Sequence, residues 1–461
     1  MYRPTCLLWL GVLLVAGAVA DGGRASAIDE PAGAAPANVV VDPAAPFVPL
    51  LSDDECWRRM PQAIEGSGQP LPNWAKAVAT HLPRTAAAML VLDHAHRTRS
   101  PLDPELRAKF RWVVARENRC DYSQAVALDD LRRAGATDET IATLQGASER
   151  WPEGDRDPLE FARWLTVDAP SIDDALFERI RRRLGDEQVA AMVLHAAYGN
   201  FQDRIVLGLG LPLEPDGPLP PLDVRFAENA FQLAPLTPQV AEPLASTEVG
   251  DVVADDPAWS SLSYEELQKR LERQRERQPR LPIPTWDEVK GRLPPAMAVR
   301  PTRIVWSLIT YGYAAELQIP WSICTRTMWA ELPGDRVFEE SLFWIQTRTI
   351  RCNYCMGHCE MLMEVAGLSP EEVAQRTRRL AGSDWSAFPA AEQRAFDYAR
   401  KLTATPWALT ASDYRTLERD LGPDKAMSTF WWLCRGLYMT RISDGFQLPL
   451  ERENVFAPPK E

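Results

Sequence analysis

Residues 352–367 read CNYCMGHCEMLMEVAG, and residues 120–135 read CDYSQAVALDDLRRAG. Both stretches begin with Cys-x-Tyr and end with Ala-Gly after the same interval, because 367 − 352 and 135 − 120 both equal 15. The sequences around them place apolar residues three and four positions apart, as in DALFERIRRRLGDEQVAAMVLHAAY, and lack the alternation typical of strands. This periodicity predicts an all-α fold.

The similarity continues downstream at a constant offset, because 398 − 161, 421 − 184 and 448 − 211 all equal 237. Self-similarity at a fixed spacing is the signature of internal repeats. We therefore predict two tandem helical repeats, which we call the first half (residues 47–214) and the second half (residues 296–461). The matching blocks are Phe161-Ala162-Arg163 with Tyr398-Ala399-Arg400, Leu184-Gly185 with Leu421-Gly422, and Leu211-Pro212-Leu213-Glu214 with Leu448-Pro449-Leu450-Glu451.

The two halves differ in their chemistry, because Ser123 stands in the first half where Cys355 stands in the second. The first half keeps one thiol here, Cys120, without a resolving partner, and we expect it to be a buried thiol. We expect the first half to pack against the second and complete its core. Cys324 and Cys434 lie in apolar helical surroundings and are expected in the core.

The remaining segments are assigned by composition. Residues 1–20 combine Arg3, an apolar run and Ala18-Val19-Ala20, which predicts a secretory signal peptide and a secreted or periplasmic protein. Residues 21–46 are predicted to be a disordered tether, and residues 215–295 a proline-rich linker with one charged helix over 264–277. The net charge of −13 without a long basic run excludes nucleic acid as an expected partner. No stable membrane insertion is expected after cleavage.

Cys352 and Cys355 form a C-x-x-C pair. A helix predicted over 336–349 and a break near Arg351 place this pair in the first turn of the next helix, which Gly367 ends. Unsatisfied amides and the helix dipole favour a thiolate there, and the spacing of three brings both sulfurs within disulfide reach. Such a pair cycles between dithiol and disulfide when an external donor reduces it.

Two further side chains join this cluster. His358 follows Cys355 by three positions on the same helix face, and imidazole exchanges protons near neutral pH. Glu340 lies on the preceding helix, and its interval to Cys352 is 352 − 340 = 12. Its carboxylate is a candidate base that deprotonates a thiol directly or through water.

The chain resembles the alkylhydroperoxidase D and carboxymuconolactone decarboxylase superfamily in one run of residues, Glu340-x11-Cys352-x-Tyr354-Cys355-x-x-His358. This run is followed by a predicted helix that ends in Ala-Gly-Leu. The resemblance covers about residues 299–451 and, more weakly, 74–214. It implies two tandem alkylhydroperoxidase D-like repeats and a homo-oligomer. It also implies that Cys355 attacks the peroxide, Cys352 resolves, and Glu340 and His358 relay protons. A hydroperoxide or other small molecule is then the substrate, with a thiol as electron donor.

The sequence departs from that family at one position. Members with a peroxidase-type site usually carry the histidine four positions after the second cysteine, where this chain has Cys359, and His358 lies one position earlier. Cys359 is therefore a possible second resolving thiol. In the first half, Ala108 and Val126 replace Glu340 and His358, so no relay is expected there.

Other interpretations of the cluster were weighed against redox chemistry. Four ligand-type side chains within eight positions of one helix cannot easily surround a tetrahedral zinc ion, so no metal is expected. The sequence has no glycine-rich phosphate loop, so no cofactor is expected. A non-catalytic scaffold or binding protein with a structural disulfide is one alternative, and a carboxymuconolactone decarboxylase-like enzyme is another. We carry forward an exported antioxidant enzyme, a thiol peroxidase or thiol-disulfide oxidoreductase with a redox-active disulfide.

Overall fold

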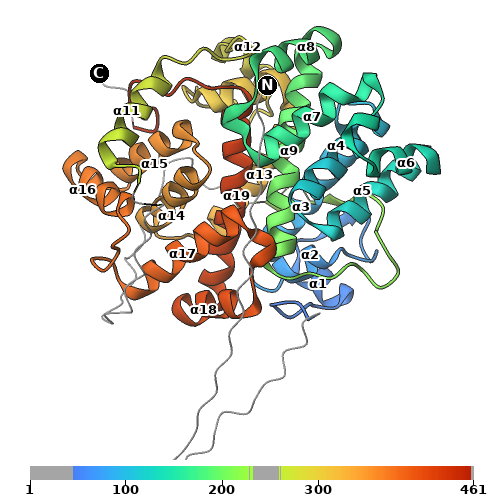
Figure 1. Ribbon diagram of the computed structural model, residues 1–461. Coiled ribbons are helices and arrows are strands. Elements are labelled where there is room, and N and C mark those ends of the chain that lie inside the picture. Colours follow the sequence, from blue (N-terminus) through green and yellow to red (C-terminus); the bar gives the residue numbers. More distant parts are fainter. Residues whose placement is uncertain (1–44, 228, 232–258, 260, 458–461) are drawn as a thin grey trace, which may run out of the picture. The chain divides into compact units, whose positions relative to one another are not determined.

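The computed structural model describes residues 45–227, 229–231, 259 and 261–457. Regular structure in these ranges is helical except for the short strands β1 (Ala63–Glu65) and β2 (Arg225–Phe226), which pair antiparallel (Figure 1). The predicted all-α fold is confirmed. The predicted signal peptide and the tether up to residue 44 lie outside the described residues. Within the described ranges, no helix combines the length and the apolar character that crossing a bilayer requires.

The first half consists of helices joined by short turns. The helices in chain order are α1 (Asp53–Arg59), α2 (Asn73–Val78), α3 (Pro83–His94), the π-helical turn η1 (Ala95–Arg99), α4 (Pro104–Glu117), α5 (Asp121–Arg133), α6 (Asp138–Gln145), η2 (Ser148–Arg150), α7 (Glu153–Val167), η3 (Ala169–Ser171), α8 (Asp174–Leu184) and α9 (Asp186–Gly208).

The rest of the chain is also helical and begins with two helices, α11 and α12, that lie in the predicted linker. The helices in chain order are α11 (Tyr264–Arg275), α12 (Trp286–Lys290), α13 (Val305–Glu331), α14 (Arg336–Thr349), α15 (Asn353–Val365), α16 (Pro370–Ala381), α17 (Ala390–Ala404), η4 (Pro406–Ala408), α18 (Ala411–Leu421) and α19 (Pro423–Gly445).

The bounds of these helices match between the halves. The starts of α14 and α15 follow those of α4 and α5 at one offset, because 336 − 104 and 353 − 121 both equal 232. The starts of α17 and α19 follow those of α7 and α9 at another, because 390 − 153 and 423 − 186 both equal 237. The helix α13 is kinked at Ala314, whose backbone is not helical (φ −143°, ψ 45°). Leu82, between α2 and α3, has a similar backbone conformation (φ −128°, ψ 62°). These two residues lie at the first of these offsets, because 314 − 82 equals 232. The tandem duplication stays a prediction, which these equal intervals favour.

The two halves pack through α9 and α19, which lie side by side (Figure 1). Arg441 on α19 donates to the Thr166 carbonyl oxygen at 3.0 Å, and Arg204 on α9 donates to the Thr403 carbonyl oxygen at 3.4 Å. Likewise α19 contacts η3, and α9 contacts η4. Such reciprocal pairs characterise two-fold interfaces between identical subunits. The first half therefore packs against the second as a partner subunit would.

The predicted linker contributes to the core of the second half. Leu267 and Leu271 of α11 are buried, α11 contacts α15, and the Gln274 side chain donates to the Leu448 carbonyl oxygen at 2.7 Å. The structure has a second helix in this segment, α12, where only one helix was expected. A capping box between Thr285 and Glu288 begins α12, and this sequence signal was not used in the prediction.

Candidate functional site

The C-x-x-C pair is positioned by the break between α14 and α15. Arg351 adopts a left-handed conformation (φ 64°), and the amide of Cys352 donates to the Thr347 carbonyl oxygen at 2.8 Å while that of Arg351 donates to the Arg348 carbonyl oxygen at 3.2 Å. These two bonds form the Schellman motif that ends many helices. Cys352 then caps α15, and Cys355 is its third residue. The predicted helix over 336–349 and the break near Arg351 are confirmed.

Three cysteines gather at this end of α15. Cys352 and Cys359 are completely buried, and the Cys355 side chain is nearly so at 2% exposure. The Cys352 thiol lies within hydrogen-bonding reach of the Cys355 thiol, and the Cys355 sulfur lies 3.2 Å from the Ser443 hydroxyl oxygen. Burial raises the pKa of Cys352 and of Cys359 well above the ordinary range, so both remain protonated near neutral pH.

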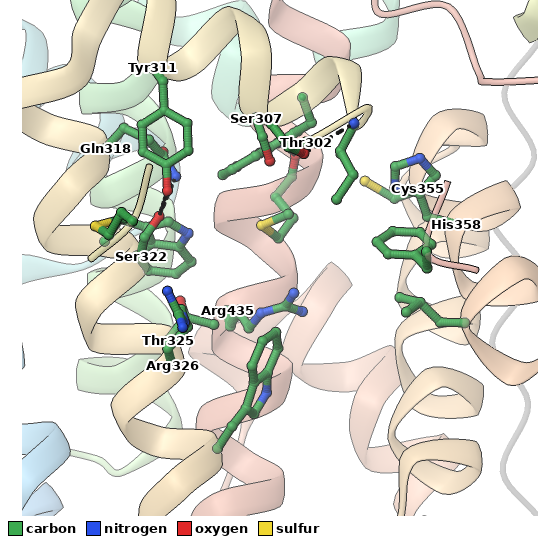
Figure 2. Close-up of a pocket in the computed structure, with 18 of the residues that line it drawn as sticks. Thr302, Ser307, Tyr311, Gln318, Ser322, Thr325, Arg326, Cys355, His358 and Arg435 are labelled. Atoms are coloured by element: carbon green, nitrogen blue, oxygen red, sulfur yellow. Dashed lines mark hydrogen bonds between the residues drawn. The ribbon is translucent and has the colours of Figure 1, made fainter. Parts of the chain in front are cut away.

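A cavity of about 160 Å³ opens beside the pair. Three of the predicted site residues line it: Cys355 and His358 from α15, which Figure 2 shows, and Glu340 from α14. Cys352 and Cys359 do not line it. The cavity therefore offers an incoming molecule one thiol, one imidazole and one carboxyl group.

His358 is held by a glutamate that the sequence analysis did not select. The imidazole Nε2 lies 2.7 Å from Glu451 Oε2, and the Glu451 Oε1 accepts hydrogen bonds from the Tyr354 hydroxyl at 3.0 Å and from the Val305 amide at 2.8 Å. Burial alone would raise the pKa of Glu451, but His358 and these hydrogen bonds lower it below the ordinary value. An ionised Glu451 fixes the imidazole and leaves its other nitrogen to exchange a proton.

Glu340 on α14 also lines the cavity. Its buried carboxyl group accepts a hydrogen bond from Arg336 at 3.3 Å, and the Cys359 thiol lies within hydrogen-bonding reach of it. Burial raises the pKa of Glu340. Across residues 261–457 no direct hydrogen bond joins Glu340 to His358 or to Cys355. Any proton exchange between Glu340 and these groups therefore needs an intermediate carrier, such as a water molecule.

Asp444 is a second acidic group that the sequence analysis missed. It follows Ser443 on α19, and its carboxyl group lies within hydrogen-bonding reach of the Cys352 thiol. Burial raises its pKa to about 7. Because α19 lies far beyond the cysteines in the sequence, local pattern could not reveal Ser443 or Asp444. Glu451 did leave a signal, since it ends the Leu-Pro-Leu-Glu block that both halves share.

The remaining sequence predictions for cysteines agree with the structure. Cys120, Cys324 and Cys434 are completely buried, and the Cys120 thiol donates to the Ser123 hydroxyl at 3.4 Å. In the part of the chain that the structure describes, no three His, Cys, Asp or Glu side chains converge as metal ligands would.

Comparison with known proteins adds little to this geometry. No protein-family model matches the chain. The chain is similar to the Uncharacterized protein YnjA of Escherichia coli (strain K12), at 24% identity over 120 residues. The matched segment covers 26% of this chain and 66% of that relative, just under two thirds of its length. The function must therefore be argued from the site.

Proposed function

We propose that the protein is a thiol peroxidase, or a related thiol-disulfide oxidoreductase, that cycles Cys352 and Cys355 between dithiol and disulfide. The observation that carries this proposal is the position of Cys355. It lies in the first turn of α15, faces a cavity together with His358, and has the Cys352 thiol within hydrogen-bonding reach. A nucleophile, a proton carrier and a resolving thiol are the three parts that peroxide reduction needs.

The reaction balances with these three groups and one external donor. Cys355 gives its proton to His358, directly or through water, and its sulfur attacks the terminal peroxide oxygen. The O–O bond breaks, an S–O bond forms, and the alkoxide takes the proton back from His358 as it leaves. The Cys352 thiol then attacks the Cys355 sulfenic acid, which releases water and forms the disulfide. A dithiol donor reduces the disulfide through a mixed disulfide.

The surrounding groups have supporting parts in this scheme. Glu451 keeps His358 in one orientation through the 2.7 Å contact, as a carboxylate orients the imidazole in other proton-transfer sites. Asp444 lies beside Cys352 and is a candidate acceptor for the Cys352 proton during disulfide formation. Cys359 has no step in this scheme, because the Cys352 thiol lies within hydrogen-bonding reach of Cys355 whereas the Cys359 thiol lies within reach of Glu340.

The wider features of the sequence fit the same proposal. The resemblance to alkylhydroperoxidase D-like proteins supports a peroxide substrate, and the signal-like segment over 1–20 supports a role outside the cytoplasm with a thiol donor of that compartment. Because one chain supplies two subunit equivalents, a homo-oligomer of this protein would need fewer chains than one built of single repeats.

The test is peroxide consumption by the purified protein with dithiothreitol as donor, using tert-butyl hydroperoxide. We expect steady turnover that Cys355→Ser reduces on the order of 10³-fold, because the nucleophile is lost. Cys120→Ser, in the first half, is the matched control and should turn over like the parent protein. Absence of turnover in the parent protein, or equal turnover in Cys355→Ser, would instead favour a scaffold or a decarboxylase that works with its cysteines blocked.

A further inference from the structure

Arg435 on α19 is buried in the wall of the cavity with unused hydrogen-bond donors. Its side chain is 7% exposed, and its Nε and Nη1 have no hydrogen-bond acceptor among the described residues. Figure 2 shows its guanidinium between the α13 side of the cavity, with Tyr311 and Ser322, and the α15 side, with Cys355 and His358. A buried cation with unused donors that faces a cavity is prepared for an anionic ligand.

The surrounding side chains keep this arginine charged without using its donors. Its guanidinium carbon lies 4.2 Å from the ring centre of Trp432 and 5.3 Å from that of Trp329, distances that favour cation–π attraction. The nearby carboxyl groups of Glu339 and Glu340 lie 3.8 Å and 3.3 Å from Arg336, so Arg336 is their closer cation. Burial lowers the pKa of Arg435 to about 10, which still leaves it charged at neutral pH.

The charge of the cavity wall contrasts with that of the chain. Four arginines line the cavity but only one carboxyl group does, that of Glu340, although the whole chain has a net charge of −13. The arginines are Arg300, Arg326, Arg336 and Arg435. A wall of this sign draws anions from solution toward the thiol.

The size and the apolar wall of the cavity limit the ligand further. Trp306, Trp321, Phe343 and Met439 contribute apolar surface. A protein cavity of about 150 Å³ lined by apolar side chains holds one benzene molecule, and this cavity measures about 160 Å³. The ligand is therefore about the size of one substituted ring or a short branched chain.

We infer that Arg435 binds the carboxylate of an anionic, ring-sized organic hydroperoxide whose peroxide group meets Cys355. The inference rests on the proposed thiol peroxidase function and names its substrate class. In the reaction the carboxylate stays ionised and bound, while the O–O bond breaks at Cys355 as described above. Arg435 thus determines specificity and takes no part in bond making or breaking.

The first test measures binding alone, so that it does not depend on turnover. Calorimetry on the full-length protein compares 4-isopropylbenzoate with its neutral analogue 4-isopropylbenzamide. We expect the benzoate to bind about tenfold more tightly or better, and Arg435→Gln to remove that preference, because a charge-assisted bidentate contact is lost. Arg435→Lys should restore part of it. Arg326→Gln, which removes another arginine of the same wall, should change the preference less than about threefold, well inside one decade.

Two results would overturn the inference. One is equal binding of benzoate and benzamide to the parent protein, a comparison that needs no variant to fold. The other is a benzoate preference that survives in Arg435→Gln or disappears equally in Arg326→Gln.

The second test separates this inference from the proposed function. Cumene hydroperoxide and its para-carboxylate are compared as substrates, and we expect kcat/KM to favour the carboxylate by about tenfold or more, again through the contact with Arg435. Reduction of both compounds at equal kcat/KM would leave the peroxidase proposal standing and refute the role of Arg435. Benzoate binding that depends on Arg435, with neither compound reduced, would refute the peroxidase proposal and keep Arg435 as an anion anchor.

Discussion

Tyr122 and Tyr354 occupy matching positions in the two halves, and each donates its hydroxyl to a glutamate, Glu214 in the first half and Glu451 in the second. Each glutamate also accepts a backbone amide at 2.8 Å, from Asn73 and from Val305, respectively. This tyrosine–glutamate pair is therefore part of the scaffold. The residues around this pair differ between the two halves. That difference indicates which groups support the fold and which could take part in catalysis.

In the first half the corresponding space is filled. The hollow beside Tyr122 and Ser123 measures about 20 Å³, against about 160 Å³ beside Cys355. Asp93 and Arg97 pair at its wall, and the Tyr198 hydroxyl, at the position of Arg435, donates to Asp93 at 2.6 Å. Val126 stands where His358 does. The first half thus keeps the support for a site but has neither the cavity nor its reactive groups.

Among the positions compared between the halves, the largest expected effect comes from the one cysteine that both halves share. Cys352→Ser should lower steady-state turnover about 100-fold or more, because the sulfenic acid on Cys355 then has no resolving thiol. One equivalent of peroxide per chain should still react. Stopped-flow and steady-state assays separate these two steps. Cys120→Ser is the control. An equal loss of turnover in that variant would refute the proposal that only the second half carries the reactive thiols.

The next effect distinguishes the two glutamates. Glu451→Gln should lower kcat/KM about 10- to 100-fold, because His358 loses the carboxylate that orients it. Glu214→Gln should leave kcat/KM within about threefold, well under the gain that general acid–base catalysis brings. Both variants lose a buried charged acceptor and should unfold about 1–3 kcal/mol more easily in urea. A loss of activity in Glu214→Gln as large as in Glu451→Gln would mean that the pair acts only through stability.

A smaller effect concerns pH, since Asp444 in the second half has no acidic counterpart in the first, where Leu207 stands. Burial raises the pKa of Asp444 from 3.8 to about 7. Its contribution to the free energy of unfolding is then fully present below pH 4 and is lost as pH rises toward 7. Asp444→Asn removes this loss. The variant should gain stability relative to the parent protein between pH 4 and 8, by on the order of 2 kcal/mol.

Urea unfolding of both proteins at several pH values measures that difference. Because other buried acids, such as Glu339 and Glu360, are present in both proteins, their titration cancels in the comparison. Parallel stability curves for the two proteins across this range would show that Asp444 is not titrating as described.

The smallest effect is expected for Cys359, which has Ala127 as its counterpart. Cys359→Ala should change kcat/KM less than about threefold, because this buried thiol does not line the cavity, and should cost about 1 kcal/mol of stability through lost packing. Peroxide assays and urea unfolding measure the two quantities. A large loss of turnover would instead support the prediction that Cys359 is a second resolving thiol.

Local sequence pattern predicted the part of the site that one stretch of chain builds. The helix ending at Thr349, the break at Arg351 and the helix that starts after Cys352 follow from apolar periodicity and from the run of residues around the pair. The duplicated blocks also led to the correct expectation that Cys120 is buried.

The groups that shape the cavity could not be predicted in this way. Ser443 contacts Cys355, Glu451 contacts His358 and Arg435 lines the cavity only because α19 and the segment after it fold back onto α15. That placement is set by packing over long sequence distances, which periodicity does not encode. Comparing the two halves residue by residue after Gly367 is the one sequence route that would have selected Glu451, because Glu214 matches it.

We propose that the second half carries a working dithiol and that the first half does not. This proposal is tested most directly by counting thiols with mass spectrometry before and after one equivalent of hydroperoxide, in the parent protein and in Cys355→Ser. We expect peroxide to convert a reduced Cys352–Cys355 pair to a disulfide, to leave Cys120 reduced, and not to react with the variant. A Cys352–Cys355 disulfide that is present from the start and resists mild reductant would refute the proposed dithiol chemistry and favour a structural disulfide in a scaffold.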